Sequence, residues 1–197
     1  LESGLSAIVQ AWYGGETAGT AVADVLFGDY NPAGRLPVTF YKSLDDLPAF
    51  ENYDMEGRTY RYFDGEVLFP FGHGLSYSRF DHRNLILEKN NILAGDSLVV
   101  SVEVTNDGPL DGEEVVQMYL TLPEEAGDPA LISLCGFRRV LIPRGQSRLV
   151  TLNLGPGEME RYHPSSASYR VAPGKYMIHV GPSSDTSLCC STVLNLR

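Results

Sequence analysis

The sequence predicts an α/β fragment followed by an all-β sandwich of seven strands. Two observations carry this prediction. Near the start, one amphipathic helix lies between two short apolar runs, which is the order of elements in an α/β domain. From Asn84 onward, apolar residues instead recur at every second position, and turn residues separate seven such runs.

The first part, residues 1–41, contains three expected elements. The apolar run 5–12 is expected to be a buried strand, or the end of a helix that leads into one. Thr17 can cap the helix that follows, and Gly28 stands where a left-handed residue would end it. The segment 35–40, "RLPVTF", is expected to be a short strand, at a sheet edge because of Pro37. The apolar stripe of the helix is Ala18, Ala21, Val22, Val25 and Leu26.

These three elements cannot form a complete domain. A single helix with two strands leaves its own apolar faces uncovered. We therefore expect residues 1–41 to be the last strand, helix and strand of an α/β sandwich domain whose earlier strands are missing. Leu1, in place of a methionine, leads to the same expectation of a processed or excised segment.

The second part, residues 42–83, has no regular period and is dense in aromatic residues, glycine and proline. This composition is too apolar for a disordered segment. A connection of this length without regular structure usually packs on a neighbour or serves a site. Either role is open at this point.

The third part, residues 84–197, is the predicted sandwich. Its turn signals include "NDGPLDG" at residue 106, "PRG" at 143 and "APG" at 172. Seven strands in about 113 residues match the size and strand number of a fibronectin-like sandwich. The seven expected strands are 84–89, 97–105, 114–122, 132–142, 147–154, 174–181 and 188–196.

Composition excludes several classes of partner. Lys and Arg total 15 against 25 Asp and Glu, and the net charge of −10 repels nucleic acids and anionic membrane surfaces. No apolar run reaches 18 residues, so no membrane-spanning helix is expected. The cysteines Cys135, Cys189 and Cys190 suggest small apolar fillers, with a strained vicinal disulfide or a reactive thiol as alternatives. No Cys or His spacing indicates a metal, and no cofactor is expected.

Five blocks of the sequence resemble a known family. The segments "AWYGGETAGTAVADVLFGDYNPAGRLPVTFYKSLDDLP", "GRTYRYF" and "LFPFGHGLSYSRF" are similar to the C-terminal part of glycoside hydrolase family 3, which includes β-glucosidases and β-xylosidases. The segments "VTNDGPLDGEEVVQMYL" and "LCGFRRVLIPRGQSRLVTLNL" resemble the fibronectin type III-like domain that follows in many members. The resemblance covers nearly the whole chain. It implies that residues 1–41 end the α/β sandwich domain and that residues 84–197 are the fibronectin type III-like domain.

The resemblance also implies a chemistry whose central residues lie elsewhere. Family members retain the anomeric configuration by using an aspartate nucleophile on an N-terminal (β/α)8 barrel and a glutamate acid/base, carboxyl groups about 5 to 5.5 Å apart. Both residues would precede Leu1, so we predict no catalytic residue in this chain and no activity of the chain alone. Many members read "PGQEGG" where this chain has residues 14–19, so Glu16 does not inherit the role of the family's glutamate.

Substrate contact is a more plausible role for this piece. Sugar rings stack on aromatic rings, and sugar hydroxyls pair with Arg, Asp or Glu. The alternative role for the aromatic residues Trp12, Tyr60, Tyr62 and Phe63 is packing between domains. His73 is expected to be a hydrogen-bonded structural residue. The candidate substrate-binding residues are Trp12, Tyr13, Glu16, Arg58 and Tyr60.

The predicted function is the C-terminal portion of an exo-acting β-glycosidase that releases terminal β-linked xylose or glucose from plant oligosaccharides. "GRTYRYF" resembles the β-xylosidase branch. The predicted partners are the upstream barrel and α/β portion of the enzyme and an oligosaccharide substrate, and the predicted location is periplasmic or secreted. The alternatives are an inactive homologue and a non-catalytic structural or carbohydrate-binding module. Against carbohydrate binding by the sandwich, its tyrosines (Tyr119, Tyr162, Tyr169 and Tyr176) are scattered along the sequence.

Overall fold

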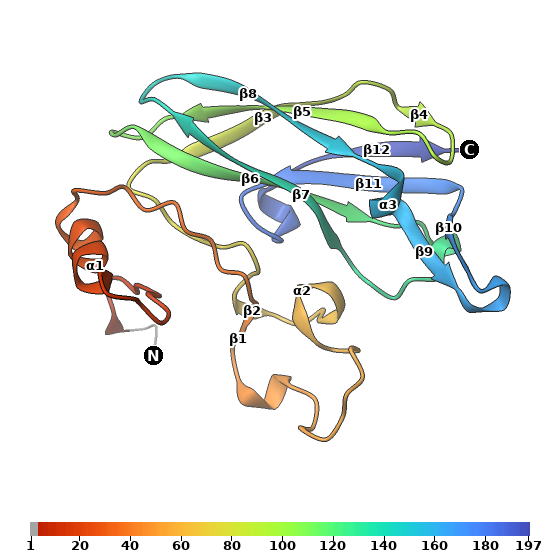
Figure 1. The fold of residues 1–197 in the computed structure, drawn as a ribbon, viewed down its shortest axis with the longest axis horizontal. Coiled ribbons are helices and arrows are strands. Elements are labelled where there is room, and N and C mark those ends of the chain that lie inside the picture. Colours follow the sequence, from red (N-terminus) through yellow and green to blue (C-terminus); the bar gives the residue numbers. More distant parts are fainter. Residues whose placement is uncertain (1–3) are drawn as a thin grey trace.

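A computed structural model describes residues 4–197 and shows a two-layered β-sandwich with an N-terminal segment attached to one side (Figure 1). All seven strands predicted for the sandwich are present. The prediction of an α/β segment followed by a sandwich is therefore confirmed at the level of fold class, although individual elements of the first segment differ from the expectation.

The sandwich consists of a five-stranded and a three-stranded sheet. The strand order is β4-β12-β11-β6-β7 in the larger sheet and β3-β5-β8 in the smaller one, and all pairs are antiparallel except β12 with β4. Alternation along these strands sends every second side chain into the space between the sheets. The strands are β3 (Phe80–Leu87), β4 (Asn91–Ile92), β5 (Leu98–Asn106), β6 (Gly112–Thr121), β7 (Ser133–Ile142), β8 (Ser147–Leu154), β11 (Gly174–Gly181) and β12 (Cys190–Leu196).

The core lies between these two sheets. In β5 the inward residues are almost fully buried, whereas their neighbours are partly exposed, as the period of two predicted. Burying each such side chain contributes roughly 1.5 to 3 kcal/mol. The central buried side chains are Leu98, Val100, Val102 and Val104 from β5, Val116, Met118 and Leu120 from β6, and Tyr176, Ile178 and Val180 from β11.

Smaller elements lie outside the two sheets of the sandwich. The hairpin of β9 (Glu160–His163) and β10 (Ser168–Val171) pairs Tyr162 directly with Tyr169, and both rings are largely exposed. Two tyrosines that are scattered in the sequence are thus neighbours on this hairpin. The short helices of this part are η3 (Glu124–Ala126), α3 (Pro156–Met159), η4 (Pro164–Ser166) and η5 (Thr186–Leu188).

The N-terminal helix α1 (Ala18–Phe27) forms as predicted. Gly28 ends it in the left-handed conformation, with φ of 86°, and its N–H donates to the carbonyl of Val25. The expected cap is absent, because the Thr17 side chain makes no capping hydrogen bond. None of the ten helical residues is buried, so the apolar stripe is not covered by the described part of the chain.

The two strands predicted beside this helix are not formed as expected. Residues 5–12 have no regular secondary structure and are exposed. A strand needs a partner for its backbone groups, and no strand among residues 4–197 lies beside this run. Of the predicted strand 35–40, only the last residue is in a strand, because β1 comprises Phe40–Tyr41.

The connecting segment contains more structure than its sequence indicated. β1 pairs with β2 (Val67–Phe69), and the helices η2 (Leu44–Asp46) and α2 (Thr59–Tyr62) lie between them. β3 begins at Phe80, inside the region that the sequence analysis assigned to the connection. In Figure 1 the orange residues of this segment lie below the five-stranded sheet.

The structure distinguishes between the alternatives that the sequence left open for the cysteines. The three cysteines are free thiols, so the vicinal disulfide considered as an alternative is not formed. Burial raises the pKa of the Cys135 and Cys189 thiols to about 12, which keeps them protonated and inert as nucleophiles.

None of the helices among residues 4–197 has the length and apolar composition that a membrane-spanning helix requires. The same residues contain no group of three His, Cys, Asp or Glu side chains placed to hold a metal ion.

Candidate functional site

Three of the predicted substrate-binding residues lie on the exposed segment before α1. Tyr13 is fully exposed, Trp12 is about half exposed at 51%, and Glu16 is also on the surface. Trp12 has a left-handed backbone with φ of 52°, which is uncommon for a bulky residue. All three side chains are therefore accessible to a ligand or to another domain.

Arg58, the fourth predicted residue, organises its own loop. Its Nε donates to the Asp54 carbonyl at 3.0 Å, and its Nη2 donates to the carbonyls of Asn52 at 2.6 Å and Ala49 at 3.3 Å. A guanidinium can serve several acceptors in one plane, which suits it to holding a loop closed. The structure thus uses Arg58 mainly as a scaffold for residues 49–54.

Tyr60, the fifth predicted residue, packs on the sandwich. Its ring stacks on Phe71 with centroids 4.2 Å apart and meets the Tyr119 ring edge-on at 6.0 Å. Its hydroxyl accepts a hydrogen bond from the Leu134 N–H at 3.1 Å. Tyr60 therefore fastens the connecting segment to β6 and β7.

The other residues of this aromatic segment also pack locally. Phe63 meets the Tyr41 ring edge-on at 4.9 Å, and the Arg61 guanidinium lies 5.3 Å from the centre of the Tyr62 ring. His73 stacks on Phe69, and its burial lowers the pKa of the imidazole. No hydrogen bond or ion pair among residues 4–197 joins Trp12, Tyr13 or Glu16 to Arg58 or Tyr60, so the five predicted residues form two separate groups.

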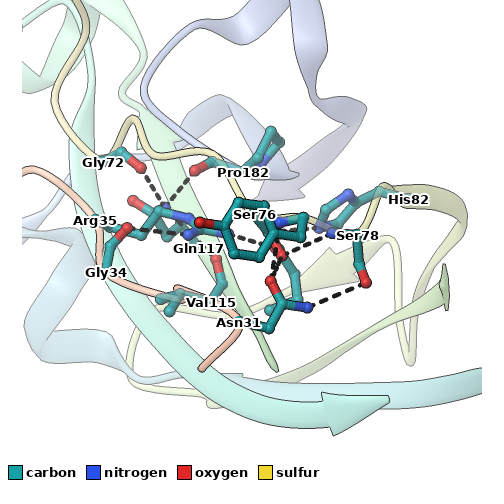
Figure 2. A network of polar contacts seen from close by, with 12 residues as sticks. Asn31, Gly34, Arg35, Gly72, Ser76, Ser78, His82, Val115, Gln117 and Pro182 are labelled. Atoms are coloured by element: carbon teal, nitrogen blue, oxygen red, sulfur yellow. Dashed lines mark hydrogen bonds and ion pairs between the residues drawn. The ribbon is translucent and has the colours of Figure 1, made fainter. Parts of the chain in front are cut away.

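A buried polar cluster was missed by sequence reasoning (Figure 2). Nη2 of Arg35 lies 2.6 Å from Oε2 of Glu114, and only 8% and 2% of these two side chains are exposed. Nε2 of His82 is 3.8 Å from Oε1 of the same carboxyl group. His82 pairs with the core residue Val104, so the cluster closes one end of the space between the sheets.

Burial dominates the electrostatics of this cluster. Desolvation raises the pKa of Glu114 to about 7, against the opposing effect of the Arg35 charge and hydrogen bond. Desolvation also lowers the pKa of His82 to about 4, with Asp81 opposing the shift and Arg35 adding to it. A perturbed carboxyl group can mark an active site. Here the direct guanidinium partner indicates a structural ion pair.

Asn31 makes a second set of contacts beside this pair. Its Nδ2 donates to the Ser78 hydroxyl at 3.2 Å and to the Asp111 carbonyl at 2.9 Å. Its Oδ1 accepts from the Ser76 hydroxyl at 2.7 Å and from the Tyr77 N–H at 2.9 Å. One side chain thus joins the turn after α1, the connecting segment and the loop that precedes β6.

Gln117 makes the third set of contacts, on the outer face of β6. Its Nε2 donates to the carbonyls of Gly72, at 3.1 Å, and Pro182, and its Oε1 accepts from the Tyr119 hydroxyl at 2.6 Å. Gly72 has φ of 81°, and a Cβ at this position would lie 2.1 Å from Oε1 of Gln117. Only glycine fits the close approach of this backbone to β6.

We call these three sets of contacts, centred on Arg35, Asn31 and Gln117, the polar clamp. They hold two stretches of the N-terminal half, residues 31–36 and 72–78, against the sandwich. Backbone hydrogen bonds also join these two stretches, from Leu36 N–H to the His73 carbonyl at 2.8 Å and from Gly72 N–H to the Leu36 carbonyl at 2.7 Å. A sequence signal was available for Glu114, because it stands at every-second-residue spacing with the core residues Val116, Met118 and Leu120, where an apolar residue is expected.

Comparisons with known proteins agree with this division of the chain. Residues 1–77 match the glycosyl hydrolase family 3 C-terminal domain, and residues 114–184 match the fibronectin type III-like domain. A xylan 1,4-beta-xylosidase of Xylanibacter ruminicola is 47% identical over 90% of this chain and 20% of its own length. A periplasmic beta-glucosidase of Salmonella typhimurium is 34% identical over 90% of this chain and 25% of its own length.

A solved structure gives the same result. Beta-glucosidase 3B from Thermotoga neapolitana matches 93% of this chain and 27% of its own, with 30% identity and a TM-score of 0.81. The chain thus spans between 20% and 27% of the length of these relatives. We conclude that the chain belongs to glycoside hydrolase family 3, as its C-terminal domain with a fibronectin type III-like domain, and is homologous to β-xylosidases and β-glucosidases over about 90% of its length.

Proposed function

We propose that this chain is the C-terminal portion of a retaining, exo-acting β-glycosidase that releases terminal β-linked sugars from plant oligosaccharides. Its own role in that enzyme is to brace the catalytic domains. The observation that carries this proposal is the polar clamp, which fixes the end of the family 3 domain on the sandwich through the buried Arg35–Glu114 pair. A flexible linker between the two parts would need no such buried contacts.

The proposed partner is the upstream barrel and α/β portion of the same enzyme. Relatives carry most of their length outside the region that matches this chain. Leu26 and Phe27 of α1 are 61% and 85% exposed, and Leu5, Ile8 and Val9 are exposed as well. Several large apolar side chains exposed on neighbouring stretches of the chain are typical of a domain interface. Trp12, Tyr13 and Glu16 lie on the same segment, and we propose that they line the substrate site at that interface.

We propose xylose as the sugar that the complete enzyme releases, with glucose as the alternative. The β-xylosidase relative is 47% identical to this chain, and the β-glucosidase relative is 34% identical over the same share of the chain. A periplasmic or secreted location is proposed, and one relative is named as periplasmic. We propose the predicted domain limits, 1–41, 42–83 and 84–197, with the start of the sandwich moved to Phe80, where β3 begins.

The proposal predicts that the isolated chain is inactive. The nucleophile and the acid/base belong to the upstream portion, so purified chain should not cleave aryl β-xylosides or aryl β-glucosides. Adding an upstream portion that contains the barrel should restore hydrolysis, with aryl β-xylosides cleaved faster. A chain with Arg35→Ala, which loosens the clamp, should restore less activity, whereas Lys42→Ala, which removes an exposed ion pair, should restore as much as the unaltered chain. Turnover by the purified chain alone would contradict the proposal.

A further inference from the structure

An ordered loop of the connecting segment holds apolar side chains in solvent. We call residues 44–58 the aromatic loop. Leu44, Phe50 and Tyr53 are 85%, 90% and 89% exposed, and the loop lines an open hollow of about 600 Å³. In Figure 1 this orange loop lies at the bottom of the molecule, away from both sheets. Exposed aromatic residues gathered around a hollow usually mark a binding surface.

Local hydrogen bonds hold the aromatic loop in one shape. Arg58 donates to three backbone carbonyls, of residues 49, 52 and 54, as described above. At the start of the loop, Ser43 and Asp46 form a reciprocal capping box around η2. The Asn52 side chain also accepts from the Asp54 N–H at 2.8 Å. A loop that is already ordered loses little conformational entropy when a ligand binds, which favours binding.

The side chains of the aromatic loop indicate which class of ligand it can bind. The hollow is lined by two aromatic rings, Phe50 and Tyr53, by aliphatic side chains, and by the polar residues Asn52 and Arg58. Aromatic faces pack well on the C–H faces of sugar rings, and the polar groups can pair with hydroxyls. The loop carries five acidic side chains against one arginine, Arg58, so its charge repels anionic ligands. A neutral ligand rich in hydroxyls fits these properties best.

We propose that the aromatic loop binds a neutral β-linked oligosaccharide, with Phe50 and Tyr53 as the contact residues. The inference rests on the proposed function for the linkage of the sugar. It adds a binding site formed entirely by this chain, which would hold the part of the substrate distal to the bond that the complete enzyme cleaves. Glycoside chains that carry uronic acid substituents are bound more weakly because of the acidic side chains.

Binding can be tested on the 197-residue chain without the upstream portion. In a two-dimensional ¹H–¹⁵N NMR titration with xylotetraose, we expect chemical-shift changes to concentrate on residues 44–58. Phe50→Ala and Tyr53→Ala should each weaken binding roughly three- to tenfold, the effect of one aromatic contact. Tyr169→Ala is the matched control, because it removes an exposed ring on the β9–β10 hairpin and should leave the affinity unchanged.

Three results would overturn the inference. The first is the absence of shifts in the loop at tens of millimolar xylotetraose. The second is equal binding of the α-linked maltotetraose or of a uronic acid-substituted xylo-oligosaccharide. The third is protection of the loop by the upstream portion, so that xylotetraose no longer shifts its signals in the assembled enzyme. The hydrolysis assay tests the proposed function independently of the titration. If the assembled enzyme is active but the loop does not bind xylotetraose, only this inference is wrong and the proposed function stands.

Discussion

The guanidinium of Arg35 and the carboxyl group of Glu114 lie 2.6 Å apart although 79 residues separate them in the sequence. Arg35 follows the turn after α1, and Glu114 belongs to β6, so the contact joins the family 3 domain to the sandwich. Two nearly buried charged groups must neutralise one another, because each alone would be costly to remove from water. The relative position of the two parts therefore depends on this pair.

Arg35→Ala is expected to destabilise the chain strongly. The substitution leaves Glu114 buried without its partner, and breaking a buried pair in this way costs roughly 3 to 5 kcal/mol of unfolding free energy. Urea denaturation followed by circular dichroism measures the loss. Lys42→Ala is the control, because its pair with Glu66 is exposed, and the denaturation midpoint should not move. Equal stability of Arg35→Ala and the unaltered chain would show that the pair does not hold the two parts together.

His82 and Glu114 should give the protein two opposing pH dependences. The pKa of His82 is lowered from 6.5 to about 4 in the fold, so the unfolded chain binds more protons in this range. The stability contributed by neutral His82 is complete above pH 6.5 and is lost as the pH falls toward 4. In the Glu114→Gln variant only the His82 dependence remains, so its free energy of unfolding should fall by roughly 3 kcal/mol as the pH is lowered from 6.5 to 4. Urea midpoints measured at half-unit pH steps test it.

Glu114 changes the stability with pH in the opposite direction to His82. Its pKa is raised from 4.5 to about 7 by burial, so the folded chain binds more protons between these values. Its contribution to stability is complete below pH 4.5 and is lost as the pH rises toward 7. His82→Leu should therefore become less stable on raising the pH through this window, whereas the unaltered chain should show a nearly flat profile. Parallel profiles for all three proteins would contradict the assignment. The other charged groups that act on His82 are Asp81 and Arg35, which are present in each protein.

Local periodicity is what allowed the sandwich to be predicted from the sequence. Alternation along β5 and β8 is a property of each strand by itself, since it reflects one buried and one exposed face. The same holds for α1 and its terminal Gly28. The run 5–12 misled the prediction because apolar composition alone does not supply the neighbouring strand that a buried strand requires.

Contacts between distant parts of the chain could not be predicted in the same way. Nothing near Arg35 or Asn31 indicates their partners in the connecting segment, on β6 and in the loop that precedes β6, which are 45 to 80 residues away. Arg58 was selected for its charge beside aromatic residues, yet its partners are backbone carbonyls that any sequence would provide. The separation of Tyr162 and Tyr169 in the sequence likewise concealed their pairing across the β9–β10 hairpin.

Gly72→Ala should destabilise the contact between the connecting segment and β6. The backbone is left-handed at φ of 81°, and the added Cβ would lie 2.1 Å from Oε1 of Gln117. Strain and displacement of Gln117 together should cost about 2 to 3 kcal/mol in urea denaturation. Gly157→Ala is the matched control, because a Cβ there meets open space on α3, and it should be neutral or slightly stabilising. Equal effects of the two substitutions would show that the segment can shift to accommodate a side chain.

Arg58→Lys should loosen the aromatic loop without unfolding the chain. Lysine keeps the charge but cannot place two nitrogens against the carbonyls of Ala49, Asn52 and Asp54. Chymotrypsin should then cleave after Phe50 or Tyr53 at least several-fold faster, while the urea midpoint changes little, because the loop lies outside the core. Arg79→Lys, at an exposed arginine of the connecting segment, provides the control and should leave the cleavage rate unchanged. If cleavage of Arg58→Lys is no faster than that of the control, the loop owes its order to η2 and to packing rather than to the hydrogen bonds of Arg58.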